Sequence, residues 1–234
     1  TAFFMPMLYQ TYEEVDFVRS RLSHELLSVT EKNGFKILTM VDVGWVYWFS
    51  SEPVYTPEDL KKSKIFTWAG DYKSSQLYEK HGYQSVPLAI TDVLSGLQTG
   101  LINTLGFNPM YTLSQQLFGI ADNMLDMKWG NLTAAIVIDN RTWNRIKPEH
   151  QSVMFDIAQN LGNGFQKKNR HETNKAIDVM KEYGLTVNTP TPDQVKKWED
   201  LIERMYPDLR GSLLDEVTFD RLMEIKKEMD SHSN

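Results

Sequence analysis

The fold of this chain is decided by two phrases, PEDLKKSKIFTWAGD at residues 57–71 and GYQSVPLAITDVLSGLQTGLINTLGFNP at residues 82–109. Short apolar runs alternate there with helical stretches, after a turn in which Thr56 and Pro57 provide a helix cap. The predicted order is strand, helix, strand, helix, strand, at 64–68, 72–80, 84–87, 91–99 and 103–107. This order is typical of an α/β sheet, in which a ligand cleft lies at the carboxyl ends of the strands.

The segments on either side add helices and further strands. Apolar residues recur at helical spacing over 11–32, and Asn33-Gly34 follows as a stop signal. The β-branched and aromatic run 35–51 is interrupted by Gly44, so we expect two strand segments that cross between lobes. Beyond it we expect a strand at 133–139, a long helix at 148–183 and amphipathic helices at 192–205 and 219–229.

The composition is that of an ordinary globular protein. The 234 residues are 41% hydrophobic, the formal net charge is -6, and there is no cysteine. Lysine and arginine are spread out rather than gathered in a stripe, which makes nucleic acid an improbable partner. The absence of cysteine excludes disulfides, thiolate metal sites and a cysteine nucleophile. No apolar run approaches the ~20 residues that a membrane-spanning helix needs.

Motifs for catalysis are missing from the sequence. The five histidines show no spacing suited to a metal site, and the glycines form neither a dinucleotide-binding nor a Walker motif. No G-x-S-x-G elbow is present, and the paired carboxylates stand at helix starts, where they complement the helix dipole. We therefore predict no catalytic residue, no metal and no cofactor, and keep an enzyme on an α/β scaffold only as the less favoured alternative.

Aromatic and apolar residues gather at positions expected to face the cleft. Ligand pockets are mostly apolar, with a few placed polar groups. The alternative is that these residues form core, and strand alternation requires about half of segment 45–49 to point away from any cleft. The candidate ligand-binding residues are Trp45, Val46, Tyr47, Phe66, Trp68, Ile90, Phe107, Asn108 and Met110.

Several phrases in a fixed order resemble the substrate-binding subunits of TRAP transporters. They are the PxLY opening, PxxTPEDLK, KI, a VP pair before a helix ending in LQTG, an Asn-Pro pair after the next strand, and W-N-x-I-x-P-E-H-Q. The resemblance implies a two-lobed periplasmic binding protein-like α/β fold with crossing strands, a long helix and a helical carboxyl-terminal end. The expected division is lobe I at 1–45 and 131–180, and lobe II at 46–130 and 181–234.

The resemblance also implies a cellular setting. Such proteins capture small organic acids in the periplasm and deliver them to membrane subunits of the transporter, and a lipid-anchoring cysteine would lie upstream of Thr1. In the family, phrases like the opening of this chain follow an amino-terminal segment that supplies the first strands of one lobe. We therefore expect that lobe I is incomplete and that the chain is truncated or processed.

The resemblance also bears on the ligand. The family's carboxylate-clamping arginine falls on Phe66, and a second, frequent arginine falls on Val46. An aromatic residue common in the family falls on Ile90, and the polar residue near the third strand is retained as Asn108. Because an arginine matches a carboxylate in charge and geometry, its loss predicts a neutral or apolar ligand, lipid-like for example, rather than the usual anion.

The carboxyl-terminal segment 196–229 reads KKWEDLIERMYPDLRGSLLDEVTFDRLMEIKKEM. It resembles the tail of a TRAP subgroup that works with a periplasmic tetratricopeptide-repeat protein. The alternative is a helical cap on lobe II. A competing function is that of an interaction component, acting through the repeat protein with no free small-molecule role.

Overall fold

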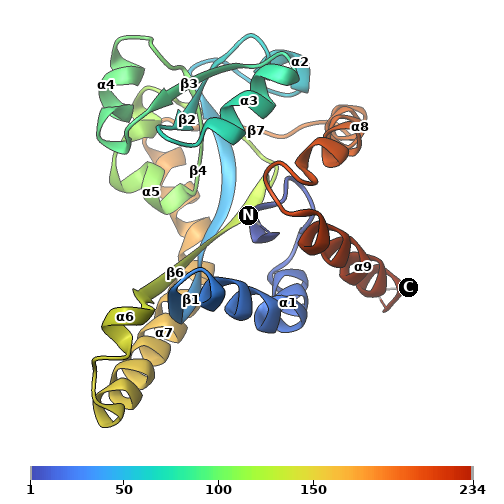
Figure 1. The fold of residues 1–234 in the computed structure, drawn as a ribbon. Helices are drawn as coiled ribbons and strands as arrows, with labels where there is room; N and C mark the ends of the chain where they lie inside the picture. The colour runs from blue at the N-terminus through green and yellow to red at the C-terminus, as the bar shows by residue number, and fades with distance from the viewer. Residues whose placement is uncertain (1, 233–234) are drawn as a thin grey trace.

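The computed structural model describes residues 2–232, apart from the side chains at positions 230 and 232. Its centre is a mixed seven-stranded sheet in the order β3-β2-β4-β1-β5-β7, with β6 paired to β1 (Figure 1). The strands are β1 (Phe35–Ser50), β2 (Lys64–Trp68), β3 (Gln84–Leu88), β4 (Thr104–Phe107), β5 (Asn123–Leu125), β6 (Gly130–Asp139) and β7 (Thr186–Asn188).

The predicted βαβαβ unit is present. Strand β2 runs parallel to both β3 and β4, with Ile65 opposite Ser85 on one side and Thr104 on the other. Helix α3 (Tyr72–Lys80) connects β2 to β3, and α4 (Val93–Gln98) precedes β4. The helix expected at 91–99 divides into a 3-10 turn, η2 (Ile90–Asp92), and α4.

The prediction of two strand segments over 35–51 is wrong, because β1 is one continuous strand of 16 residues. Gly44 has a φ of +130°, and the register with β6 shifts between Asp42 and Gly44. Glycine absorbs this bulge at low steric cost, so the chain bends there without leaving the sheet. One end of β1 pairs with β4 and β5 and the other with β6, so β1 runs through both halves of the molecule (Figure 1).

The helices surround this sheet. Helix α1 (Tyr12–Lys32) opens with a capping box in which the Thr11 hydroxyl accepts from the Glu14 amide. Helix α7 (Pro148–Glu182) is unbroken over 35 residues. The remaining elements are η1 (Ala2–Phe4), α2 (Pro57–Leu60), α5 (Pro109–Ser114), η3 (Leu117–Gly119), α6 (Asn140–Trp143), α8 (Pro192–Leu209) and α9 (Glu216–His232).

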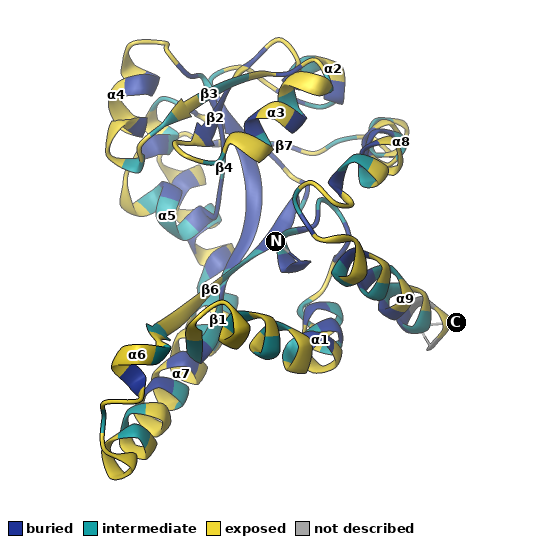
Figure 2. Ribbon diagram, viewed as in Figure 1, coloured by how far each residue is buried: buried dark blue, intermediate teal, exposed yellow. Residues whose placement is uncertain are grey.

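Buried apolar residues form two cores of very different size. The large core joins the upper end of β1 to β2, β4, β5, α8 and α9, and contains the fully buried Phe49 and Trp198. The buried residues of the small core are Leu38, Trp143 and Ala158, between β1, α6 and α7, and they are 5% to 9% exposed. Figure 2 shows the consequence, since the end of the molecule formed by β6, α6 and α7 is mostly exposed.

A buried carboxylate joins α1, β1 and α7. Asp42 is fully buried and accepts hydrogen bonds from Arg19, from Nε of Arg170 at 2.8 Å and from Nδ2 of Asn131 at 3.0 Å. Arg170 also forms an ion pair with Asp16 on α1. Each charge is paired, as burial in an apolar interior requires.

The boundaries of lobes I and II that the sequence predicts remain a prediction.

Candidate functional site

A cavity of about 440 Å³ lies at the carboxyl ends of strands β2 and β4. Its lining includes Val46 and Trp48 from β1, Phe66 and Trp68 from β2, and Phe107 from β4. Four of these were candidate ligand residues, and Trp48 belonged to the same aromatic segment. The placement follows from the βαβ order, because the carboxyl ends of β2 and β4 meet at one edge of the sheet.

The aromatic rings of this cavity pack against each other. The centroid of the Phe66 ring lies 5.4 Å from that of Trp68 and 5.3 Å from that of Phe107. The Trp48 ring meets Trp129 edge to face at 5.3 Å. Such pairs fix the positions of the rings beyond what area burial alone would do. Phe66 and Phe107 are nearly buried, whereas Trp68 is 49% exposed at the cavity mouth.

Strand alternation separates the candidate residues of β1. Val46 and Trp48 line the cavity, while Trp45 and Tyr47 are not among its lining residues. The Trp45 ring packs 5.0 Å from that of Tyr12, and burial raises the pKa of the Tyr47 phenol above its usual range. Trp45 and Tyr47 therefore have structural contacts on the other side of the strand.

Three further candidates lie outside the cavity lining, namely Ile90, Asn108 and Met110. Ile90 starts η2 and Met110 lies in the first turn of α5, and both are half-buried. Asn108 is the N-cap of α5, where its Oδ1 accepts from the Tyr111 amide at 2.8 Å, and its Nδ2 donates to the Val43 carbonyl at 3.0 Å. This amide ties α5 to β1 beside the Gly44 bulge.

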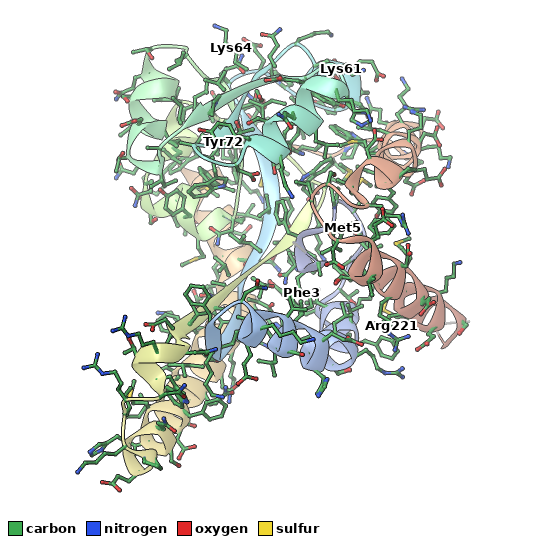
Figure 3. The ribbon with its side chains drawn as sticks, in the orientation of Figure 1. Phe3, Met5, Lys61, Lys64, Tyr72 and Arg221 are labelled. Carbon is green, nitrogen blue, oxygen red and sulfur yellow. The ribbon has the colours of Figure 1, made fainter. Side chains whose placement is uncertain are left out.

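The rest of the cavity wall comes partly from residues beside these strand positions and partly from segments far away in sequence. Figure 3 shows Met5 on the amino-terminal segment, below the strands β2 and β3 in that view. The lining residues that the sequence did not indicate are Phe4, Met5, Pro6, Thr67, Asp71, Lys73, Ser74, Leu77, Tyr78, Gly106, Trp129, Leu132, Met205, Leu209 and Leu213. The helical and loop patterns of these residues do not show that they share one cavity. No sequence signal therefore identifies them as lining residues.

Most polar side chains of the cavity are engaged within the protein, whereas the buried Nε1 of Trp48 has no hydrogen-bond partner among the described residues. Thr67 Oγ1 lies 3.0 Å from Ser75 Oγ, and Asp71 Oδ2 accepts from Ser74 Oγ at 2.6 Å. Lys73 Nζ donates to the Ser212 carbonyl at 2.8 Å. Desolvation raises the pKa of the Tyr78 phenol, so its ring is neutral at physiological pH. The cavity is therefore an aromatic and aliphatic space, with its one acid and one lysine at the start of α3.

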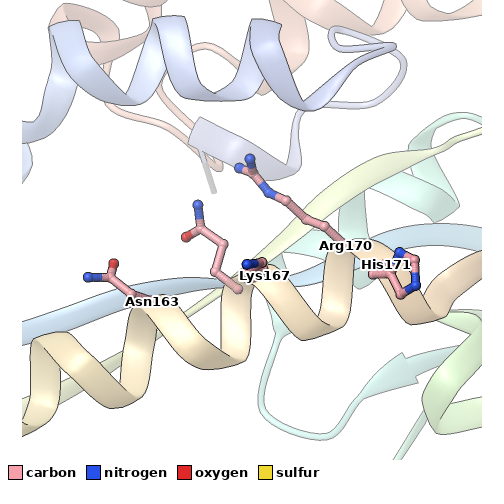
Figure 4. A pocket seen from close by; sticks show the side chains of 5 residues that line it. Asn163, Lys167, Arg170 and His171 are labelled. Atoms are coloured by element: carbon pink, nitrogen blue, oxygen red, sulfur yellow. The ribbon is translucent and has the colours of Figure 1, made fainter.

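A second, more open concavity of about 530 Å³ lies along α7 (Figure 4). It is lined by Asn163, Gln166, Lys167, Arg170 and His171. The guanidinium of Arg170 is already taken up by Asp16 and Asp42. This concavity belongs to the charged junction of α1 with α7 and is not part of the aromatic cavity.

Among residues 2–232, no group of three or more histidine, aspartate or glutamate side chains is arranged so that it could hold a metal ion. None of the helices within that range is both long enough and apolar enough to cross a membrane.

Comparison with solved structures shows the fold. The chain superimposes with a TM-score of 0.86 on the periplasmic ectoine-binding protein of the TeaABC TRAP transporter of Halomonas elongata, at 19% identity, covering 98% of this chain and 76% of that one. It superimposes with a TM-score of 0.88 on a TRAP periplasmic solute-binding protein from Ralstonia eutropha with bound (S)-2-acetolactate, at 15% identity, covering 97% and 74%. These likenesses confirm the predicted two-lobed α/β fold.

Curated relatives agree with the structural comparison. Over 170 residues the chain is 27% identical to the 2,3-diketo-L-gulonate-binding periplasmic protein YiaO of Escherichia coli. The matched residues make up 72% of this chain and 52% of that protein. Over 161 residues the chain is 27% identical to the ectoine-binding periplasmic protein TeaA of Halomonas elongata, 67% of this chain and 47% of TeaA. The chain thus spans about half the length of these relatives.

The family model of bacterial extracellular solute-binding protein family 7, named DctP, matches residues 1–211. This match covers most of the chain and includes all the phrases that resemble TRAP binding subunits. The chain therefore belongs to the DctP family of TRAP periplasmic solute-binding proteins.

Proposed function

We propose that this chain is the substrate-capturing part of a TRAP-type periplasmic binding protein, and that its ligand is neutral or largely apolar. The observation that carries the proposal is the aromatic cavity around Phe66 and Trp48. The relatives are named for ectoine and 2,3-diketo-L-gulonate, and solved neighbours hold acetolactate, galacturonate and pyroglutamate. Small-molecule capture is thus the activity that family membership favours.

The two positions that correspond to the family's arginines both face the cavity and are both apolar. Val46 is 2% exposed and Phe66 is 5% exposed, so both side chains line the cavity almost out of contact with bulk water. A carboxylate buried against them would lose several kcal/mol of hydration without an ion pair in return. Apolar ligand surface would instead gain about 25 cal/mol per Å² on burial. The energetic balance thus favours a neutral or apolar ligand.

Lys73 is the cation among the lining residues, and it needs separate consideration. Its ammonium group donates to the Ser212 carbonyl and its side chain is exposed at the cavity mouth. A lysine can donate three hydrogen bonds, so it could bind a ligand oxygen there. In our proposal it interacts with the polar end of an amphipathic ligand, while the aromatic wall holds the apolar part.

The proposal extends to partners and location. We infer periplasmic action with TRAP membrane subunits, either free in the periplasm or attached by a lipid anchor, and association of the segment 196–229 with a tetratricopeptide-repeat protein. Family membership supports periplasmic action with TRAP membrane subunits. The sequence of the carboxyl-terminal segment supports association with the repeat protein. Sedimentation of the chain mixed with a candidate repeat protein tests that association, and two independent species at micromolar concentration would contradict it.

Fluorescence titration tests the ligand class directly, because Trp48, Trp68 and Trp129 all line the cavity. We expect a medium-chain monoacylglycerol to change tryptophan emission in a saturable way, and succinate to leave it unchanged at equal concentration. Phe66→Arg should weaken binding of the monoacylglycerol at least tenfold. The control is Phe155→Ala on α7, outside the cavity lining, which should bind as the wild type does.

Two results would contradict the proposal. The first is tight binding of succinate by the wild-type protein. The second is binding of the monoacylglycerol that is equally strong in Phe66→Arg, because the aromatic cavity would then not be the site. If succinate binds and Lys73→Met removes that binding, the mouth of the cavity acts as an anion site and the ligand class is wrong.

A further inference from the structure

The wall of the aromatic cavity contains a buried donor, the indole N–H of Trp48. Trp48 is 2% exposed, and its Nε1 has no hydrogen-bond partner within residues 2–232. An indole N–H can only donate, and a buried one ordinarily finds an acceptor. Trp198 shows this usual arrangement, because its Nε1 donates to the Tyr55 carbonyl at 2.9 Å. The Trp48 donor is therefore desolvated without a bond in return, and packing alone does not account for it.

The position of the Trp48 ring is set by neighbours that also line the cavity. Trp48 is paired with Gly106 of β4, and a Cβ at position 106 would lie 3.3 Å from Trp48 Cζ3 and 3.6 Å from Cε3. The benzene edge of the indole thus lies against the glycine, and the nitrogen is at the far end of the ring system. The rings of Tyr78 and Trp129 meet Trp48 edge to face, with centroids at 6.3 Å and 5.3 Å. All three neighbours are lining residues, so the donor belongs to the cavity wall.

Polar side chains elsewhere in the cavity differ from Trp48, because the protein itself supplies their partners. Thr67 pairs with Ser75, and Lys73 donates to the Ser212 carbonyl. A donor placed in a mostly apolar wall is the usual means by which a ligand pocket fixes the orientation of its ligand. The partner that Trp48 lacks within the described residues is thus of the kind that a ligand supplies.

We propose that Trp48 Nε1 donates a hydrogen bond to an oxygen in the apolar part of the ligand, which is a neutral molecule with a carbonyl-type acceptor, such as an ester or a ketone. This inference rests on the proposed function, because it takes the aromatic cavity as the ligand site. An acceptor supplies the bond that the buried donor lacks, whereas a hydrocarbon of the same shape leaves it unmade. A site of this kind discriminates against the analogue without the acceptor. Trp48 is thus a specificity-determining residue.

Two ligands of nearly equal shape test this inference, hexan-2-one and 2-methylhex-1-ene, in which a methylene group replaces the carbonyl oxygen. Headspace gas chromatography measures the dissociation constant of each volatile compound for the 234-residue chain. Trp48→Phe keeps an aromatic ring and removes the N–H. In this variant the dissociation constant of the alkene divided by that of the ketone should fall at least fivefold. The same substitution in the small core, Trp143→Phe, lies outside the cavity lining and should leave this ratio unchanged.

Nuclear magnetic resonance of the wild type gives a second readout that does not depend on the folding of a variant. The indole N–H signal of Trp48 is assigned from the proximity of its ring to Gly106. Saturating hexan-2-one should move this proton signal downfield, because a hydrogen bond to oxygen deshields the proton, and 2-methylhex-1-ene should not. The Trp198 signal is the internal reference and should stay in place, since its N–H is already bonded to Tyr55.

Two results would overturn the inference and leave the apolar cavity as the ligand site. The first is an unchanged ratio in Trp48→Phe when both compounds bind. The second is a Trp48 signal that saturating hexan-2-one does not move, because water or the face of a neighbouring ring such as that of Trp129 would then serve the donor. If the wild type binds neither compound, the aromatic cavity is not the ligand site, and the proposed function fails together with this inference.

Discussion

The two cores of this protein show two ways of holding β1 in place. Around its carboxyl-terminal half, β1 is enclosed by strands and helices on both sides, and Trp45, Val46, Tyr47, Trp48 and Phe49 are all buried. Around its amino-terminal half, only Leu38, Trp143 and Ala158 form a closed apolar cluster, and the strand depends on the ion pairs of Asp42. Packing dominates one half and charge pairing the other.

The largest effect should come from truncating the same side chain in the two regions. Phe49 is fully buried in the large core, whereas Phe155 on α7 is 38% exposed. Phe49→Ala should lower the free energy of unfolding by about 3–5 kcal/mol. Phe155→Ala should cost less than about 1 kcal/mol, since it loses little burial. Urea unfolding followed by far-ultraviolet circular dichroism measures both, and equal losses would contradict the division into two cores.

The next effect concerns the charged junction. Asp42→Ala leaves Arg19 and Arg170 half-buried without their shared carboxylate, so we expect a loss of roughly 3 kcal/mol. Asp178→Ala removes an exposed ion pair with Lys181 and should leave stability unchanged. In Asp42→Ala, amide hydrogen exchange should accelerate in α7 but not in β2 or β3. Uniform acceleration would show that the two regions unfold as one unit.

Two neighbouring glycines in α7 provide a smaller and sharper comparison. A Cβ at Gly162 would contact Thr39 and would lie 3.1 Å from Val41 Cγ1, whereas a Cβ at Gly164 meets nothing within 4 Å. Gly162→Ala should therefore destabilise the protein by about 1–3 kcal/mol. Gly164→Ala should stabilise it by about 0.5–1 kcal/mol through helix propensity. Thermal unfolding of the two variants checks the opposite signs, and a gain in Gly162→Ala would show that α7 does not rest on β1 there.

The smallest predicted effect is a dependence on pH. The hydrogen bond from Arg170 lowers the pKa of Asp16 below its usual value of 3.8. A lowered pKa in the folded state stabilises the protein above the unfolded-state pKa, and this contribution is lost as pH falls through the folded-state pKa. The stability difference between wild type and Asp16→Asn should thus be constant above about pH 5 and shrink below about pH 4. A constant difference down to pH 2 would contradict the pairing.

Much of the fold could be predicted from the sequence. Turn signals, caps and periodicity located β2, α3 and the long α7 almost to the residue. The break expected at Gly44 did not form, because a bulge lets one strand continue through a positive φ. Propensity cannot tell such a bulge from a strand end, since both favour glycine.

The cavity was harder to predict than the fold. Position at strand ends indicated Phe66, Trp68 and Phe107, which line it. Asn108 caps α5 and is not among the lining residues, because a residue at the start of a helix can direct its side chain to the helix amides. Met5 and Leu209 lie on opposite ends of the chain, and their meeting depends on tertiary packing that local pattern does not encode.

Calorimetric titration of the wild type and Phe66→Arg with succinate and with a medium-chain monoacylglycerol distinguishes a neutral-ligand cavity from an anion site. An apolar cavity for a neutral ligand predicts that the wild type binds the monoacylglycerol more tightly than succinate, and that Phe66→Arg shifts this preference toward succinate by at least tenfold. A wild-type protein that binds succinate more tightly than the monoacylglycerol would contradict it.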